Sequence, residues 1–294
     1  MKFLLLGNGS IGRKHSSILR EMGHEVVTVD PNPAAEADYA HTDNICTITN
    51  PAGNPVNRFD GILDCTPPDV RNGWEVPARV RFVEKPLGVR HEDFHFIRHD
   101  EPTMLGFCYR WLPSLEAFKT SLDNCRVYSL TMLAGSYLPD WHPDEDYRLR
   151  YHGTPGRGGI VLDSLPHSLY IARWLMGDLH PLGVVSRHLS NLDILTPDVA
   201  AILLEARTGQ PVYILVDYLR QPGGSRIEAV TSEGVKVWEF DPGEAPTMYR
   251  RQMEVWCEIC EGRRQYGYPN LRDGLAVQQV LDAVEKCAYE REVK

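Results

Sequence analysis

Residues 2–12 read KFLLLGNGSIG, an apolar run that ends in a GxGxxG pattern. An unbroken apolar run is typical of a strand that is covered on both faces of a parallel sheet. In such a turn the first glycine permits the tight bend, the second lets a pyrophosphate approach the backbone, and the third lets the next helix pack on the strand. That helix also points its first amide groups at the phosphate. The stretch therefore predicts a strand, a phosphate-binding turn and a helix that ends near Gly23.

Asp30 ends the second strand candidate, residues 25–30 (EVVTVD). An acidic side chain at this point accepts hydrogen bonds from the ribose hydroxyls of adenosine and repels a 2′-phosphate. The pattern favours a dinucleotide site for NAD, and the nearby Arg13 and Lys14 keep NADP as the second possibility. The alternative is a glycine-rich turn of another α/β domain, in which Asp30 only ends a strand. The candidate cofactor contacts are Gly7, Asn8, Gly9, Ser10, Ile11, Gly12 and Asp30.

The hydrophobic pattern of the chain changes near residue 109. Before this point strand-like runs alternate with helical stretches, which predicts a Rossmann domain with a doubly wound parallel sheet. After it, the last four strand candidates follow one another without a helix of useful length, which predicts an α+β domain with an open, mostly antiparallel sheet. We expect a nucleotide-binding domain over residues 1–109 and a substrate-binding and oligomerisation domain over residues 110–294. The strand candidates are 2–6, 25–30, 60–65, 81–84, 104–108, 125–134, 200–206, 212–219, 227–231 and 235–240, and the helix candidates in the second half are 163–176, 247–260 and 272–290.

The composition argues against several classes of protein. The chain has 294 residues, of which 43% are hydrophobic and 24% charged, as in ordinary globular proteins. Its net charge of −9 repels phosphate backbones and argues against nucleic-acid binding. Its apolar runs are shorter than the ~18 residues of a membrane span, and its start is too short for a signal-peptide core. Seven scattered cysteines are expected to stay reduced, so we predict a cytoplasmic protein.

Several motifs recur together along the chain. They are His15 after the turn, Thr66-Pro67-Pro68, Glu84-Lys85-Pro86, the run GFCYR at 106–110, the run GGIVLDSLPH at 158–167, and RDG at 272–274. With these motifs the chain resembles the Gfo/Idh/MocA family, the oxidoreductases related to glucose-fructose oxidoreductase and inositol dehydrogenase. The resemblance runs nearly end to end. Its specificity comes from the coupling of Glu-Lys-Pro to the nucleotide turn upstream and to GGxxxDxxxH downstream.

The resemblance implies that Lys85, Asp163 and His167 form the working site. It also places Thr66, Pro67, Glu84, Lys85 and Arg110 beside the cofactor. Lys85 follows a strand, and open α/β sheets bind ligands at the carboxyl ends of their strands. A solvated lysine is the more ordinary reading of that position taken alone.

Asp163 and His167 are four residues apart and share a face if both lie in the opening turns of a helix. Pro166 is tolerated only in a first turn, so the helix is expected to begin between Asp163 and Leu165. The alternative is an N-capping aspartate beside a surface or core histidine.

Hydride transfer from an alcohol needs a base that takes the hydroxyl proton. We assign this role to His167, whose side chain titrates near neutrality. The ammonium of Lys85 would stabilise the developing alkoxide, and Asp163 would orient the imidazole or bind a neighbouring hydroxyl. The chemistry needs no metal.

We therefore predict an NAD(P)-dependent oxidoreductase acting on a hydroxyl or keto group of a sugar, polyol or sugar derivative. Two alternatives remain: an imine or C=C reductase, and a non-catalytic dinucleotide-binding protein.

Residues 135–152 combine aromatic and hydrogen-bonding side chains, which suits a polyhydroxylated substrate. Trp141, Arg148 and Tyr151 are the candidate contacts, and the arginine hints at an anionic ligand. An ordinary surface loop or a subunit contact is the alternative for each of them. We also expect a homodimer or homotetramer formed through the open sheet.

The chain departs from the family pattern at three places. Arg71 stands where many relatives have a histidine, and Cys108 stands where many have an asparagine. The stretch between Asp30 and Asp60 is shorter than usual for the family. These differences argue against assigning a known substrate by analogy.

Overall fold

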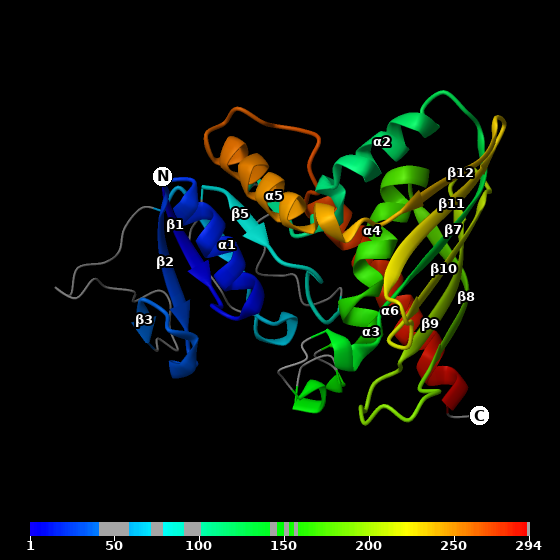
Figure 1. The fold of residues 1–294 in the computed structure, drawn as a ribbon, viewed down its shortest axis with the longest axis horizontal. Coiled ribbons are helices and arrows are strands. Elements are labelled where there is room, and N and C mark those ends of the chain that lie inside the picture. The colour runs from blue at the N-terminus through cyan, green and yellow to red at the C-terminus, as the bar shows by residue number, and fades with distance from the viewer. Residues whose placement is uncertain are drawn as a thin grey trace. The chain divides into compact units, whose positions relative to one another are not determined.

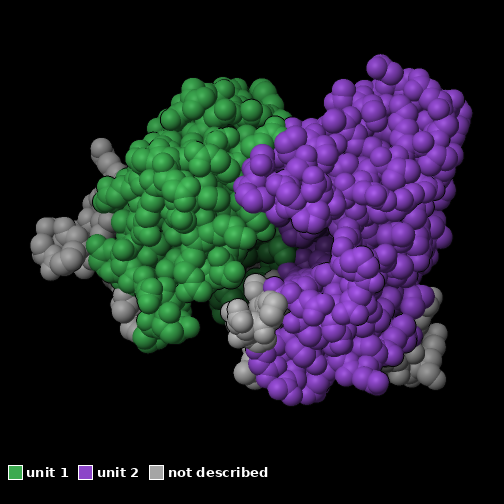
Figure 2. Space-filling view, in the orientation of Figure 1, with its two compact units in different colours: residues 1–88, 92–107, 249–274 green, residues 89–91, 108–248, 275–294 purple. Residues whose placement is uncertain are grey.

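The computed structural model of the chain describes residues 1–40, 59–71, 79–90, 101–141, 146–149, 153–155 and 158–292. The chain folds into two compact units, which Figure 2 distinguishes by colour. Unit 1 comprises Met1–Gly88, Glu92–Phe107 and Tyr249–Gly274, and unit 2 comprises Val89–His91, Cys108–Met248 and Leu275–Lys294. The units therefore differ from two consecutive domains divided at residue 109, because residues 249–274 join the first unit.

Unit 1 is built on a six-stranded parallel sheet (Figure 1). Its strands are β1 (Lys2–Leu6), β2 (Glu25–Asp30), β3 (Tyr39–Ala40), β4 (Gly61–Asp64), β5 (Arg81–Val83) and β6 (Thr103–Leu105). They pair side by side in the order β3-β2-β1-β4-β5-β6, the order of a Rossmann sheet. The doubly wound parallel sheet expected from the sequence is confirmed. The two-residue strand β3 was not expected, because so short an edge strand leaves no hydrophobic pattern.

Helix α5 (Ala245–Cys260) belongs to unit 1 from Tyr249 onward and packs on the sheet of that unit. Trp256 is fully buried, with its ring centroid 4.4 Å from that of Phe3 and 6.3 Å from that of Phe82. A Cβ atom on Gly61 would lie only 2.6 Å from the Trp256 ring, so β4 accepts this helix because it begins with glycine. This packing is the physical reason why residues so late in the chain belong to unit 1.

Unit 2 is built on a six-stranded mixed sheet. Its strands are β7 (Val127–Gly135), β8 (Leu179–Arg187), β9 (Val199–Ala206), β10 (Pro211–Asp217), β11 (Gly224–Thr231) and β12 (Gly234–Glu239). Their order is β12-β11-β7-β10-β9-β8, and only the pair of β7 with β10 is parallel. The open, mostly antiparallel sheet is thus confirmed. Strand β8 was not expected, because Pro181 and Gly183 interrupt its pattern and shift its register.

Helices cover one face of this sheet. These are α2 (Pro113–Leu122), α3 (Gly159–Asp163) and α4 (Leu165–Met176), which lie on the same side of strands β7 to β12 in Figure 1. Helix α2 was not expected, although Pro113 at its start and the buried Leu115, Phe118 and Leu122 are ordinary helix signals. Helix α6 (Leu271–Glu292) ends the described chain and α1 (Ser10–Glu21) follows the glycine turn. Among the helices of the described ranges, none is both long and apolar enough to cross a bilayer.

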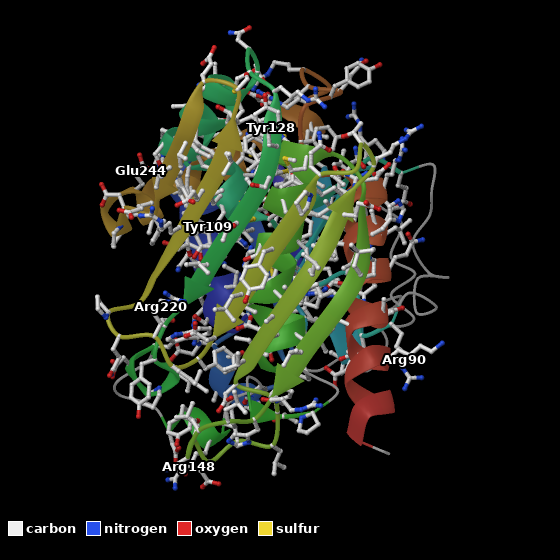
Figure 3. The ribbon with its side chains drawn as sticks, turned by 90° about the vertical axis from the view of Figure 1, so that its right-hand side faces the viewer. Arg90, Tyr109, Tyr128, Arg148, Arg220 and Glu244 are labelled. Carbon is white, nitrogen blue, oxygen red and sulfur yellow. The ribbon has the colours of Figure 1, made fainter. Side chains whose placement is uncertain are left out.

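In the part of the chain that the structure describes, no helix covers the other face of the unit 2 sheet, which is seen from the front in Figure 3. Burial alternates along its strands, as in β9, where Ala200, Ile202 and Leu204 are buried and Leu203 is exposed. The uncovered face, called here the outer sheet face, carries exposed apolar side chains as well as charged ones such as Arg226 and Glu228. Its exposed apolar side chains are Val185, Leu203, Tyr213, Val230, Val235 and Val237.

Trp256→Ala tests the assignment of α5 to unit 1. Removing a fully buried tryptophan is expected to lower the free energy of unfolding by about 3–5 kcal/mol in urea denaturation. Tyr266→Ala is the matched control, because Tyr266 lies in the same unit and is 83% exposed, and it should change stability by less than about 0.5 kcal/mol. Equal effects of the two substitutions would contradict the packing described here.

Candidate functional site

The turn after β1 has the shape that a bound pyrophosphate needs. Gly7 has a φ of +85°, and a Cβ atom there would lie 2.8 Å from the carbonyl oxygen of Cys65. A Cβ atom on Gly12 would lie 2.0 Å from the carbonyl oxygen of Gly7, so only glycine lets α1 start this close to β1. Around the Cβ position of Gly9, by contrast, no atom of the described chain lies within 4 Å. The open side of the turn is therefore at the second glycine, where phosphate oxygens approach.

Asp30 is fixed to this turn. The backbone N–H of Asn8 donates to Asp30 Oδ2 over 2.6 Å, and the N–H of Asn32 donates to Oδ1 over 2.8 Å. The buried Asn8 side chain donates to the carbonyl of Ala35 over 2.7 Å. The structure thus brings together two of the predicted cofactor contacts, Asn8 and Asp30. Lys14, one of the two residues because of which NADP stayed a possible cofactor, has its Nζ 4.2 Å from the ring centroid of Tyr249.

The carboxyl ends of β4 and β5 carry a second group of predicted residues. After β4, the Thr66 hydroxyl and N–H both donate to Asp64 Oδ1, over 2.5 Å and 3.0 Å. After β5, Glu84 Oε1 lies 2.7 Å from His15 Nε2, and Glu84 Oε2 accepts the N–H of Lys85 over 3.1 Å. The carboxylate of Glu84 is therefore buried, and both of its oxygens form hydrogen bonds. Through these bonds it connects the backbone of the half-buried Lys85 to helix α1.

Cys65 directly follows Asp64 in the sequence and is influenced by the charges of both Asp64 and Glu84. Burial raises the pKa of its thiol well above the ordinary value, and the charges of Glu84 and Asp64 raise it further, while Arg71 opposes them. The thiol is thus held in its neutral form. A nucleophilic role for Cys65 does not fit this environment.

Asp163 and His167 lie on either side of a short break between two helices of unit 2. Asp163 is the last residue of α3, and His167 lies in the first turn of α4, which begins at Leu165 with Pro166 in its first turn. The helix start expected from Pro166 is confirmed. Asp163 is buried, which is unusual for a carboxylate without a functional or structural partner.

Two tyrosines complete this group. The ring of Tyr109 stands edge to face with that of His167 at a centroid distance of 5.1 Å, and with that of Phe240 at 5.5 Å. Burial raises the pKa of Tyr109 and of Tyr218, and the negative charge of Asp163 raises both further. Asp163 thus lies near both phenols. The sequence did not single out Tyr218, because Tyr218 is an ordinary aromatic residue after a strand. Tyr109 was noted only as part of the motif at residues 106–110.

Comparison with known proteins gives a match for most of unit 2. Residues 120–236 match the family model described as the GFO/IDH/MocA C-terminal domain. This part of unit 2 is therefore similar to a Gfo/Idh/MocA C-terminal domain. The resemblance inferred from the sequence is therefore confirmed. No sequence among curated proteins matches the chain.

Solved structures share the fold of the whole chain. A probable dehydrogenase from Thermotoga maritima superposes with a TM-score of 0.79 at 17% identity, over 99% of this chain and 97% of the other. The WlbA dehydrogenase from Bordetella pertussis, in complex with NADH and UDP-GlcNAcA, gives 0.76 at 19% identity, over 98% and 96%. A myo-inositol dehydrogenase from Corynebacterium glutamicum gives 0.75 at 18% identity, over 99% and 97%. At these identities the likeness shows the fold.

Arg110 and Trp141, two further predicted contacts, are held within unit 2. Arg110 donates to Glu116 Oε1 over 2.9 Å, and its guanidinium lies 4.0 Å from the ring centroid of Trp174. This engagement gives Arg110 a packing role within unit 2. The indole N–H of Trp141 donates to the Ser136 hydroxyl, and its ring stands edge to face with Tyr218 at 5.3 Å. Trp141 is therefore connected through Tyr218 to the surroundings of Asp163.

Arg148, by contrast, is exposed and forms a two-pronged pair with Asp146, with Asp193 also within 3.8 Å. Tyr151, the remaining candidate contact, lies outside the described residues. Within the described ranges, no three His, Cys, Asp or Glu side chains gather in a way that could hold a metal ion.

Alkylation of Cys65 tests the charges at the strand ends. Below its pKa, the thiolate fraction of a thiol grows about tenfold per pH unit, so the labelling rate of Cys65 by iodoacetamide should keep rising up to pH 10. Peptide mass spectrometry reports the rate for each cysteine, with the half-buried Cys125 as the internal check on the reagent. A plateau for Cys65 below pH 9 would contradict the buried and negatively charged surroundings described for its thiol.

Proposed function

We propose that the chain is an NAD(P)-dependent oxidoreductase that transfers hydride between a nicotinamide cofactor and a hydroxyl or keto group of a sugar, polyol or sugar derivative. The observation that carries the proposal is the turn at Gly7 to Gly12, which is open at Gly9, fixed to Asp30 and set on a Rossmann-ordered sheet. The fold shared with dehydrogenases, among them WlbA in complex with NADH, supports it.

The residues present fit a dinucleotide. The first amides of α1 would hold the pyrophosphate at Gly9, Ser10 and Ile11. Asp30 would accept the ribose hydroxyls, and its charge opposes the 2′-phosphate of NADP, so NAD is the favoured cofactor. Lys14 supports the same preference, because its ammonium already lies against Tyr249. Two further fold neighbours are described in complex with NAD: GenD2 from gentamicin A biosynthesis and an oxidoreductase from Agrobacterium radiobacter.

When bound, the nicotinamide accepts or supplies hydride. Side chains of the protein then transfer the hydroxyl proton and stabilise the negative charge on the substrate oxygen. The ammonium of Lys85 stabilises negative charge on the substrate oxygen and holds that oxygen in place. His167 accepts the hydroxyl proton in oxidation and returns it in reduction.

Asp163 and Tyr109 support His167 in this scheme. The carboxylate of Asp163 orients the imidazole or accepts a hydrogen bond from a neighbouring substrate hydroxyl; both roles suit a buried acidic group. The edge-to-face contact of Tyr109 limits rotation of the imidazole ring.

The substrate class is argued from Trp141 and its neighbours. An indole held by Ser136 and Tyr218 offers an apolar face of the kind that sugar rings stack on. WlbA in complex with UDP-GlcNAcA and the Agrobacterium enzyme in complex with L-tartaric acid point the same way, toward hydroxylated substrates that carry an acid group. Arg148 and Tyr151 remain proposed contacts. The cytoplasmic location also remains a proposal, and the free thiols among the described cysteines are compatible with it.

Lys85→Ala, assayed in a cofactor-reduction screen, is the decisive test. The screen offers NAD and NADP with polyols, aldoses, sugar acids and nucleotide-sugars, and follows nicotinamide absorbance. With the best substrate, Lys85→Ala should abolish turnover while NAD affinity stays within about tenfold, roughly 1.4 kcal/mol. Lys119→Ala, at a half-buried lysine paired with Asp123 in unit 2, is the control and should behave as the parent.

The same screen separates the alternatives. Turnover that survives His167→Ala, together with a reducible C=N or C=C substrate, would favour an imine or C=C reductase. Dinucleotide binding without turnover on any substrate would favour a non-catalytic binding protein. Equal turnover in Lys85→Ala and the parent would remove the lysine from the mechanism.

We also propose that two or four copies associate through the outer sheet face, whose exposed apolar side chains lie on neighbouring strands. Leu203 and Tyr213 are direct partners across β9 and β10 near its centre. The double variant Leu203→Glu/Tyr213→Glu should therefore be monomeric in light scattering where the parent is a dimer or tetramer. Leu195→Glu is the matched control, since Leu195 is 82% exposed but lies outside the strands. A monomeric parent would contradict the proposal.

A further inference from the structure

Arg71 is a buried arginine at the carboxyl end of the β4 segment. It follows the short helical turn Pro68–Val70, and only 1% of its surface is exposed. An arginine stays charged at any physiological pH, carries five N–H donors and accepts no hydrogen bond. Such a group is stable inside a protein only when its donors are used. The acceptors that it meets therefore indicate what it does.

The guanidinium of Arg71 donates to backbone carbonyls on both sides of Lys85. Its Nη1 reaches the carbonyl oxygen of Glu84 at 2.5 Å, that of Pro86, and that of Leu87 at 3.3 Å. The residues before and after the lysine are thus held by one rigid, planar group. The segment that follows β5 consequently has little freedom to change its path.

The same guanidinium also holds the neighbouring strand end. Its Nη2 donates to the carbonyl of Thr66 over 2.7 Å, and its Nε lies 3.6 Å from Asp64 Oδ1. Asp64 and Thr66 belong to the end of β4, so Arg71 joins the loops that follow two adjacent strands. The lysine's own N–H is bound by the carboxylate of Glu84. The peptide group that joins Glu84 to Lys85 is therefore held at both its carbonyl and its N–H, and the carbonyl of Pro86 is held just beyond the lysine.

Arg81 shows what a buried arginine does elsewhere in the same unit. It opens β5, at the opposite end from Lys85, and pairs with Glu101 over 3.2 Å. That contact is between side chains of opposite charge and stabilises the amino end of the strand. The contacts of Arg71 differ because most of them are to backbone carbonyls, three of which lie directly before and after Lys85.

We propose that Arg71 is a positioning residue that fixes the backbone from which Lys85 projects, and so sets where the lysine ammonium meets the substrate oxygen. This inference rests on the proposed function of Lys85. Arg71 itself does not need to touch substrate or cofactor.

The kinetic test uses Arg71→Met and Arg71→Lys, with Arg81→Met as the matched control. Arg71→Met removes every donor but keeps an unbranched apolar chain, and Arg71→Lys keeps the charge but loses the planar fork. With the best substrate of the screen, kcat should fall at least about tenfold in Arg71→Met, while the dissociation constant of NAD changes less than about threefold. Arg71→Lys should recover part of kcat. Arg81→Met should lower the melting temperature while kcat stays within about twofold.

A chemical test gives an answer without any substrate. In the parent chain, an amine-reactive acetylating reagent should label Lys85 slowly, because its backbone is held and its side chain is half buried. Peptide mass spectrometry should show labelling at least about threefold faster in Arg71→Lys and Arg71→Met, with Lys119 unchanged as the internal reference. This arm separates the two proposals, because Lys85 can become mobile even if no substrate is ever turned over.

Three outcomes decide the inference. A parent-like kcat in a folded Arg71→Met or Arg71→Lys chain would overturn it, and so would an unchanged Lys85 labelling rate. If Arg71→Met does not fold, the kinetic and labelling results of Arg71→Lys decide the matter alone. A fall in kcat together with faster labelling of Lys85 supports the inference.

Discussion

The close approach of Gly12 to the carbonyl of Gly7 is the constraint on which unit 1 depends. A single added carbon atom at residue 12 would lie 2.0 Å from that carbonyl oxygen. Because the position is glycine, α1 begins directly on β1, and its next turn brings His15 within 2.7 Å of Glu84. Glu84 in turn binds the N–H of Lys85. The glycine at position 12 thus affects the position of Lys85, because the buried side chains of His15 and Glu84 connect helix α1 to the end of β5.

The strand ends of unit 1 concentrate charge that the solvent does not reach. Asp64, Arg71 and Glu84 are all buried, and a buried charge is stable only when it is paired and hydrogen-bonded. Here the charges are used to hold backbone: Asp64 holds Thr66, Glu84 holds Lys85, and Arg71 holds the carbonyls around both loops. Such an arrangement makes these strand ends rigid, which suits the role proposed for Lys85, since that role needs the lysine in one position. Unit 2 has a comparable buried acidic group, Asp163, whose neighbours are the side chains of Tyr109 and Tyr218.

Features with a local signal were predictable from the sequence. The apolar run of β1, the glycine turn and the final Asp30 each follow from steric rules within a few residues, and Pro166 correctly marked the start of α4. Features that depend on packing between residues far apart in the sequence were not predictable in this way. The pattern of α5 indicates an amphipathic helix, but only the fold shows that Trp256 fills the space left by Gly61. Arg71 was noted only as a departure from the family pattern, since an arginine in a loop is ordinarily expected in solvent.

The measurement that tests the central claim most directly is the fate of the hydrogen on the reacting carbon. The chain is incubated with NAD and a substrate that carries deuterium on the carbon bearing the reactive hydroxyl, and the reduced cofactor is analysed by mass spectrometry. The account predicts one deuterium in each reduced nicotinamide, matched by one oxidised product. Reduced cofactor without deuterium, or binding of NAD with no reduction by any hydroxylated substrate, would contradict it.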